Sequence, residues 1–326
     1  MHRTSPFAIA FIALIVFMAA LPQVVRAQQD YPNKPIRMVT MFSESANSNR
    51  YRFVAAKLGE QLGVIVVIDA KAGGGGVIAL RDVYRAQPMG YSLLLANNNL
   101  VGNAFAYKEP GYRIEDYTPV GVMGLSPYAM VMNASAVPAK NLTEFVAWAK
   151  ANPGKANFGS LGPAAGSNIS AERFKLMAGI NMTGVPYKGG DQMALAMLAG
   201  DIHVTWISLN SARARMQNKQ IIGLASTGED RSPLLPQVPT FREMGYPDMD
   251  TATWYATFAP ATMPAAMLTK LRGAFAAASA VPEWKTVMEQ NELEPYKGTN
   301  EQFMAMVRKE ATLLGADYQR LKLPQE

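Results

Sequence analysis

The sequence predicts an α/β protein of two domains, each built on a mostly parallel sheet flanked by helices. Segments with strand character alternate with segments whose apolar residues recur at helical spacing, and this alternation occurs twice along the chain. The length agrees, because 326 residues exceed what one hydrophobic core usually supports. With 49% hydrophobic and 17% charged residues, the chain can bury two sizeable cores.

Apolar spacing assigns the elements of the first unit. Segment 50–62 carries apolar residues at helical spacing and Gly63 ends it, whereas segment 64–69 is apolar on both faces, as in a buried parallel strand. The expected order is strand 35–42, polar loop 43–49, helix 50–62, strand 64–69, helix 77–86 and strand 91–95.

The second unit repeats the pattern with different lengths. The expected order is a strand ending at 130–132, helix 142–151, strand 157–159, a Gly/Ser/Asn loop, a helix reaching Met177, strand 184–186, helix 192–198, and strands 202–207 and 221–225. After a proline-rich stretch, a strand over 254–258 and a mostly helical segment from residue 267 complete the chain.

The first 27 residues have the three parts of a secretory signal peptide. A basic start at Arg3 precedes an apolar run over 6–21, and Val25 and Ala27 supply the small residues of a cleavage site. The alternative is a membrane anchor, but a run of about 16 residues is shorter than the roughly 20 that span a bilayer. We therefore expect an exported protein that begins at Gln28.

Composition excludes several classes of chemistry. The chain has no Cys and two His, which removes disulfides, Cys-based zinc sites and cysteine nucleophiles. His203, the histidine that remains after cleavage, lies in an apolar strand and is expected to be structural. Ser–Lys or carboxylate chemistry stays formally open. No block of five basic residues occurs, so nucleic acid is not an expected partner.

No cofactor or metal site is expected. The glycine run 73–76 precedes a helix and could hold an anion, but it lacks the Lys-Ser/Thr of a P-loop, and a tight turn is the preferred interpretation. Asp248 and Asp250 fit a solvated turn better than a metal site, because no cluster of His and carboxylates has ligand spacing.

Three polar loops follow strands and precede helices, at 43–49, 97–99 and 160–168. In open α/β sheets ligands bind beyond the carboxyl ends of the strands, so these loops predict a cleft between the domains. The third loop leads into a helix that Ser167 or Asn168 could cap, and its hydroxyls and helix-start amides could surround a carboxylate.

Seven segments give the chain a specific resemblance. In order they are 31–37 (YPNKPIR), 90–94 (GYSLL), 137–140 (VPAK), 149–155 (AKANPGK), 185–189 (VPYKG), 231–240 (RSPLLPQVPT) and 254–260 (WYATFAP). On these residues the chain resembles the substrate-binding receptors of the tripartite tricarboxylate transporters, also called the Bug family, across essentially the whole mature sequence.

The resemblance implies a periplasmic receptor of the Venus-flytrap type, without catalytic activity and monomeric. Such a receptor closes on a small molecule, usually a carboxylate, and delivers it to membrane transporter subunits. It also implies that the chain crosses between domains near Ser126 and Thr253. The expected division is a signal peptide over 1–27, a first domain over 28–126 plus 253–326, and a second domain over 127–252.

The resemblance and the polar loops together give the expected ligand-binding residues. They are Phe42, Ser43, Glu44, Ser45, Ala46, Asn47, Asn49, Asn97, Asn98, Asn99, Ser160, Leu161, Ala165, Gly166, Ser167, Asn168, Tyr187, Ile207 and Ser208. The first loop departs from the family pattern Pro-Phe-x-x-Gly-Gly-x-x-Asp at Met41, Ser45, Ala46 and Asn49. Asn168 stands where a His is common, and Ile207 and Ser208 replace an acidic or amide position.

Glu44 bears on the ligand class, because a carboxylate beside a ligand carboxylate would repel it. Either Glu44 faces solvent, which is preferred, or Arg50 neutralises it, or the ligand carries an amine or amide. Two other functions stay open at this point. One is a secreted hydrolase using Ser and Lys, and the other is a sensory receptor that presents its ligand to a signalling partner.

Overall fold

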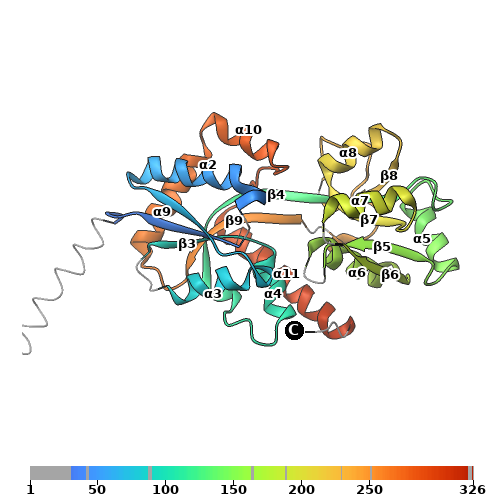
Figure 1. The fold of residues 1–326 in the computed structure, drawn as a ribbon, viewed down its shortest axis with the longest axis horizontal. Helices are drawn as coiled ribbons and strands as arrows, with labels where there is room; N and C mark the ends of the chain where they lie inside the picture. The colour runs from blue at the N-terminus through green and yellow to red at the C-terminus, as the bar shows by residue number, and fades with distance from the viewer. Residues whose placement is uncertain are drawn as a thin grey trace, which may run out of the picture.

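The computed structural model describes residues 31–41, 44–86, 90–162, 165–187, 189–228, 230–249, 252–321 and 325. The expected signal peptide lies outside the described residues, as do Phe42 and Ser43. Figure 1 shows two lobes of α/β structure joined by two long strands, β4 (Tyr117–Asn133) and β9 (Ala252–Pro260). This shape agrees with the predicted pair of α/β units.

The first lobe takes its elements from both ends of the chain. Its N-terminal part contains β1 (Ile36–Thr40), α2 (Glu44–Leu62), β2 (Val66–Ala70), η1 (Gly74–Gly76), α3 (Val77–Arg85), β3 (Ser92–Asn97), α4 (Asn99–Ala106) and η2 (Ile114–Asp116). Its C-terminal part contains α9 (Ala265–Ser279), α10 (Pro282–Gln290) and α11 (Asn300–Leu321).

Strand alternation explains why both faces of this sheet are covered. Leu93 and Leu95 of β3 point to the face under α2, α9 and α10, whereas Leu94 and Ala96 point to the face under α3, α4 and α11. Successive side chains of a strand point to opposite faces, so an uninterrupted apolar strand needs helices on both sides. Figure 1 shows these two helix layers on either side of the sheet.

The second lobe has the same construction over the middle of the chain. It contains α5 (Leu142–Ala151), β5 (Ala156–Ser160), α6 (Gly166–Ala178), β6 (Met182–Pro186), α7 (Gly190–Ala199), β7 (Val204–Ser208), α8 (Leu209–Gln217), β8 (Ile221–Ser226) and η3 (Pro247–Met249). Met130 and Met132 of β4 enter one core of this lobe, and Ala129 and Val131 enter the other.

The strands of the described residues form one continuous nine-stranded sheet, in the order β2-β1-β3-β9-β4-β7-β5-β6, with β8 also paired to β4. Strands β1–β3 and β5–β7 are parallel to their neighbours in each group, as expected, whereas β4, β8 and β9 pair antiparallel. The first part of β4 pairs with β9 and its last part pairs with β7 and β8. In the β4–β9 ladder Ser126 lies opposite Thr253.

The structure has helices that are not expected from the sequence at the start of α2, at α4 and at α8. The polar loop over 43–49 is wrong from residue 44 onward, because α2 begins at Glu44; the segment has neither Gly nor Pro to stop a helix. Apolar spacing does not predict helix α8, because only Leu209 and Ala212 of its nine residues are buried and its periodicity is therefore faint.

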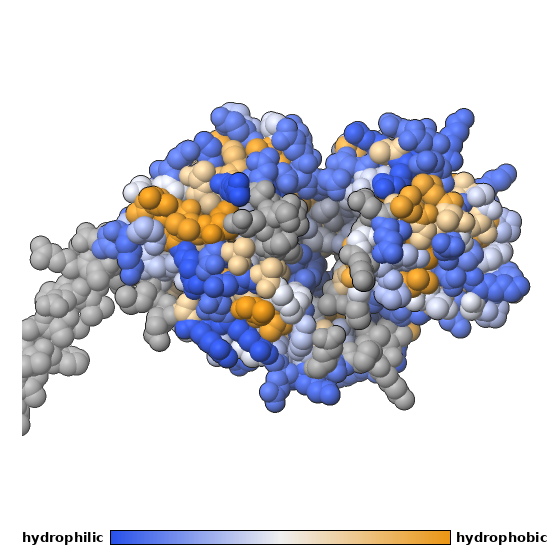
Figure 2. Space-filling model, viewed as in Figure 1, coloured by the Kyte–Doolittle hydropathy of each residue, from blue (hydrophilic) through white to orange (hydrophobic). Residues whose placement is uncertain are grey.

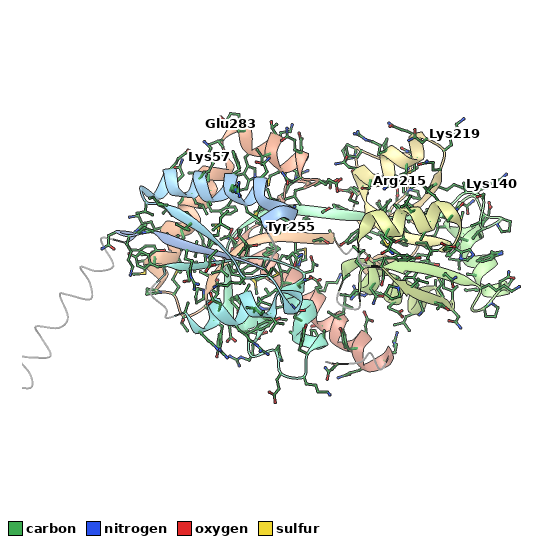
Figure 3. The ribbon with its side chains drawn as sticks, viewed as in Figure 1. Lys57, Lys140, Arg215, Lys219, Tyr255 and Glu283 are labelled. Atoms are coloured by element: carbon green, nitrogen blue, oxygen red, sulfur yellow. The ribbon has the colours of Figure 1, made fainter. Side chains whose placement is uncertain are left out.

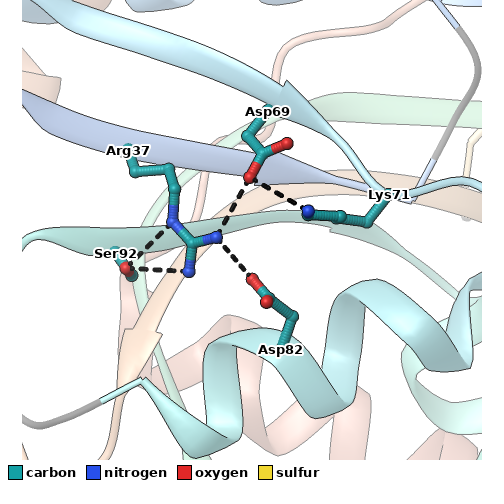
Figure 4. Close-up of polar contacts among 5 residues, drawn as sticks. All are labelled: Arg37, Asp69, Lys71, Asp82 and Ser92. Atoms are coloured by element: carbon teal, nitrogen blue, oxygen red, sulfur yellow. Dashed lines mark hydrogen bonds and ion pairs between the residues drawn. The ribbon is translucent and has the colours of Figure 1, made fainter.

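A charge cluster joins three strands to α3 at the edge of the first lobe, as Figure 4 shows. The Arg37 guanidinium of β1 lies 3.0 Å from an Asp69 oxygen and 2.8 Å from an Asp82 oxygen, and Lys71 lies 3.7 Å from Asp69. Ser92 of β3 accepts from the same guanidinium. Two cations contact two carboxylates here, so the charges of the cluster balance one another within the protein.

Figure 2 shows a mainly hydrophilic face on both lobes, with apolar groups on each. Leu195 and Leu198 of α7 are 68% and 42% exposed, and Ile65 beside β2 is 69% exposed. Within the part of the chain that the structure describes, no helix combines the length and apolar character needed to cross a bilayer.

Candidate ligand-binding site

A cavity of about 250 Å³ lies in the second lobe, bounded by the starts of α6 and α8, by α7 and by the end of β7. Its polar lining is Tyr128, Ser167, Thr205, Ser208, Ser211 and Arg215. Its apolar lining includes Met193 and Met197 of α7 and Leu161 after β5. None of the described residues lining it is acidic, so an anion entering the cavity would meet no like charge there.

The start of α6 supplies hydrogen-bond donors to this cavity. Ala165 occupies the N-cap in an extended conformation and makes no side-chain cap bond, and the expected caps at Ser167 and Asn168 are wrong because the helix begins at Gly166. The amides of Asn168 and Ile169 donate to the Ala165 carbonyl. The Gly166 and Ser167 amides lie in the first turn, where no helix carbonyl precedes them to accept their hydrogen bonds. They are therefore available to an anion.

Ser167 is the most informative side chain of the site. It is 3% exposed, and its hydroxyl has no hydrogen-bond partner among the described residues although it lines the cavity. A buried hydroxyl without a partner costs free energy, so its presence is explained if a ligand supplies the acceptor. Gly166 allows this placement, because a Cβ there would come within 2.8 Å of the Tyr128 hydroxyl.

Helix α8 supplies the second set of polar groups. It follows β7 directly, with Ser208 as N-cap accepting from the Ser211 amide at 3.3 Å. Ser208, Ser211 and Arg215 share one face of the helix, since residues three and four apart lie above one another. Ser208 is among the expected site residues, whereas Ser211 and Arg215 are not. The sequence signal that could have identified them is their spacing of three and then four residues after Ser208, which places all three on one face of a helix that follows a strand.

The structure brings together six of the expected site residues in this cavity. They are Leu161, Ala165, Gly166, Ser167, Ile207 and Ser208. Ser160 is buried at the end of β5, where its hydroxyl lies 3.4 Å from the Gly162 amide, and its carbonyl accepts from the Tyr187 amide.

The asparagines expected at residues 97–99 bind other parts of the protein. The Asn97 side chain accepts from the Asn99 amide at 3.0 Å, and the Asn99 side chain donates to the Gly75 carbonyl at 2.9 Å. Asn98 accepts from the Trp254 amide at 2.8 Å and donates to the Ala252 carbonyl and the Glu310 carboxyl. These amides therefore fix the turn between β3 and α4, and Asn99 already belongs to α4.

The other expected residues of the first lobe lie at the start of α2. Glu44, Ser45, Ala46 and Asn47 are in the helix, but their side chains lie outside the described part, and Asn49 is exposed. Arg50 is 3% exposed, and its guanidinium lies over the Tyr255 ring at 3.8 Å from the centroid. Figure 3 labels Tyr255 on β9, between the lobes, so Arg50 brings a buried cation to the lobe boundary.

Two further sequence features have structural roles. Each glycine of the run 73–76 has a positive φ, and the Gly75 carbonyl accepts from Asn99 and Asn103, as a tight turn requires. His203 accepts from the Asn157 amide through Nδ1 at 3.0 Å, and burial lowers its pKa. Among the described residues, no group of three His, Cys, Asp or Glu is placed to hold a metal.

Helix α11 connects the first lobe to the second beside the crossing strands. Asp317 of α11 lies 2.9 Å from the Arg173 guanidinium of α6, and Lys309 lies 3.8 Å from Asp248 of η3. Glu310 accepts from the Trp254 indole at 2.8 Å and from Asn98. Burial raises the pKa of the Glu310 carboxyl, although the Trp254 and Asn98 hydrogen bonds oppose the rise.

Changing Glu310 to Gln is expected to stabilise the protein relative to the wild type as pH rises from 4 to 7. The folded wild type holds the Glu310 proton more tightly than the unfolded chain, so it loses stability as pH rises through the raised pKa. Gln does not titrate. Urea unfolding at both pH values measures the difference, with Glu283→Gln on the exposed surface of α10 (Figure 3) as the control. Equal pH dependence in the wild type and Glu310→Gln would contradict the expectation.

Comparison with known proteins identifies the family to which the chain belongs. The family model described as tripartite tricarboxylate transporter family receptor matches residues 50–323. The chain belongs to this family. Among its relatives, a UPF0065 protein of Bordetella pertussis is 30% identical over 295 residues, covering 90% of this chain and 91% of the relative. Protein BugT of the same organism is 29% identical, covering 77% of this chain and 78% of that protein.

Solved structures of other receptors share the fold. The periplasmic binding protein BugD has a TM-score of 0.71 and 26% identity, with 91% of this chain and 100% of that chain covered. The R. palustris protein Rpa4515, determined with adipate, has a TM-score of 0.73 and 26% identity over the same shares. The resemblance to the receptor family and the two-domain fold expected from the sequence are both confirmed.

Proposed function

We propose that the protein is a periplasmic receptor that binds a small organic acid and delivers it to membrane transporter subunits, without catalysing a reaction. The observation that carries this proposal is the buried Ser167 hydroxyl, which lacks a partner among the described residues and lies at the uncapped start of α6. Arg215 adds a positive charge to the same cavity. Donors, a cation and the absence of acidic lining in the described residues together favour a carboxylate.

Two relatives support the same ligand class and location. Rpa4515, whose structure is similar to this one, was determined with the carboxylate adipate, and BugD is named as a periplasmic binding protein. The expected signal peptide fits export to the periplasm. A Ser–Lys hydrolase is disfavoured, because no described residue that lines the cavity is a lysine.

We also propose that the domains meet at Ser126 and Thr253, so that the first spans 28–126 plus 253–326 and the second spans 127–252. These residues pair across β4 and β9, where the strands pass between the lobes. Ligand would close the first lobe, with the start of α2 and Arg50, over the cavity of the second. Closure would exclude water and strengthen the polar contacts that hold the acid.

A thermal-shift screen of the mature chain against mono-, di- and tricarboxylates, amino acids, amides and amines tests the ligand class. A ligand at 100 times its Kd adds about 2.7 kcal/mol of stability, which raises the melting temperature measurably. Stabilisation by carboxylates supports the proposal, whereas stabilisation by amines or amides alone would overturn it. Turnover of a ligand would favour the hydrolase, and capture of a signalling protein in place of transporter subunits would favour the sensory role.

Ser167→Ala is expected to weaken carboxylate binding about 10- to 100-fold while leaving stability unchanged or slightly raised. The hydroxyl makes no hydrogen bond with the described residues of the free protein, but would donate to the bound acid, and a hydrogen bond to a charged group contributes about 1.5–3 kcal/mol. Isothermal titration and urea unfolding measure the two effects. Ser279→Ala at the end of α9, in the first lobe, is the control, and a large loss of stability in Ser167→Ala would show that Ser167 has a structural role.

A further inference from the structure

Arg215 adds a positive charge to the cavity beyond the hydrogen-bond donors at the start of α6. Arg215 is half-buried and lines the cavity, and Figure 3 shows it on α8 next to α7. Its Nη1 donates to the Ser211 carbonyl at 3.2 Å, and it forms no ion pair with an acidic side chain among the described residues. A half-buried guanidinium with only a carbonyl partner is poorly compensated, so an anionic group beside it would bind favourably.

The position of Arg215 along α8 places its guanidinium at a distance from Ser208, where the helix starts. Ser208 and Arg215 are seven residues apart, which corresponds to about 10 Å along a helix. The side chain leans back toward the preceding turn, as its bond to the Ser211 carbonyl shows. The guanidinium therefore lies about one helical turn from the Ser208 end of the cavity.

Apolar side chains form the part of the wall that faces α8 along this distance, whereas Ser211 adds a hydroxyl on the α8 side. Met193 and Met197 come from α7, and Ile207, one residue before the end of β7, packs against the same cluster. Methylene groups of a ligand would be buried there without leaving a polar group unpaired. The cavity of about 250 Å³ is slightly smaller than the roughly 300–1,000 Å³ usual for ligand pockets, so the apolar part of a ligand must be short.

We propose that Arg215 determines ligand specificity by pairing with a second anionic group, so that the ligand is a dianion with a short apolar middle. This inference rests on the proposed function, which places the first carboxylate at Ser167 and the start of α6. Because Nη1 is held by the Ser211 carbonyl, the opposite edge of the guanidinium, with Nε and Nη2, faces the second group. That edge offers the two parallel donors of a bidentate carboxylate contact.

The test compares straight-chain dicarboxylates of four to eight carbons with their half-amides, using isothermal titration. The wild type is expected to bind its preferred dicarboxylate roughly 10- to 100-fold more tightly than the matching half-amide, which keeps one carboxylate and the chain length. In Arg215→Met, which retains the apolar stem, this preference should disappear through weaker dicarboxylate binding, with half-amide binding unchanged.

Arg213→Met is the matched control, because Arg213 is an exposed arginine on the same helix and does not line the cavity. It should keep the wild-type preference. Equal weakening of dicarboxylate and half-amide in Arg215→Met, or an unchanged preference, would overturn the role of Arg215. A wild type that binds monocarboxylates as tightly as dicarboxylates would also overturn it while leaving the proposed function intact. A wild type that binds no carboxylate would refute the proposed function itself.

Discussion

Replacing Asp317 by Ala is expected to lower the free energy of unfolding by about 3–5 kcal/mol, because it leaves the Arg173 guanidinium buried without its anion. The two side chains are 4% and 15% exposed, and Nη1 and Nη2 of Arg173 already lack hydrogen-bond partners among the described residues. The loss should appear in urea unfolding monitored by circular dichroism.

A double variant distinguishes the effect of losing the Arg173–Asp317 ion pair from the effect of losing the volume of its side chains. Arg173→Met with Asp317→Leu removes both charges and keeps much of the volume, so it should be less destabilised than Asp317→Ala alone. Lys309→Ala, which removes the exposed contact with Asp248, should change stability by less than about 1 kcal/mol. An Asp317→Ala protein as stable as Lys309→Ala would show that Arg173 remains hydrated when its partner is removed.

Phe174→Ala is expected to cost about 3–5 kcal/mol of stability through the cavity it leaves in the second lobe. Phe174 is fully buried on α6, with ring centroids 6.0 Å from Trp206, 5.3 Å from Phe241 and 5.3 Å from Tyr246. Thermal and urea unfolding measure the loss.

Phe174→Leu fills much of the same space and should lose about 1–1.5 kcal/mol. Because Trp206 also lines the candidate cavity, Phe174→Ala should weaken ligand binding as well, whereas Phe174→Leu should bind nearly normally. Equal destabilisation by Ala and Leu would show that the aromatic ring, more than its volume, holds this core together.

Local patterns make most of the fold predictable. The sequence predicts helix 142–151 with the bounds that α5 has, and a strand such as β3 is recognisable because its apolar run is continuous. The full length of β4 is not predictable in this way because Pro119, Gly121 and Pro127 interrupt its strand character, yet antiparallel pairing with β9 tolerates them with register shifts. Tertiary pairing, which is not visible in a local window, completes that strand.

The candidate site is predictable only where it coincides with a strand end. Ser167 is expected because its polar loop follows a strand and precedes a helix, a position that recurs in binding loops. Ser208 is expected only from the resemblance to the family pattern. Arg215 is the seventh residue of helix α8. At such a position the local sequence of a half-buried arginine does not differ from that of an exposed one, so its place in the site is not predictable. The Arg173–Asp317 pair joins residues 144 positions apart, and nothing in the local sequence relates them.

The two strands shared by the lobes limit how the lobes can move as a mechanical joint. β4 and β9 pass between the lobes (Figure 1), and they are paired to each other along a ladder that includes Ser126 opposite Thr253 and Pro127 opposite Ala252. Sliding one lobe past the other would break this ladder, whereas bending and twisting the ribbon would preserve it. Such a joint is expected to rotate easily and to resist translation, so the closure proposed above would be a swing of one lobe toward the other.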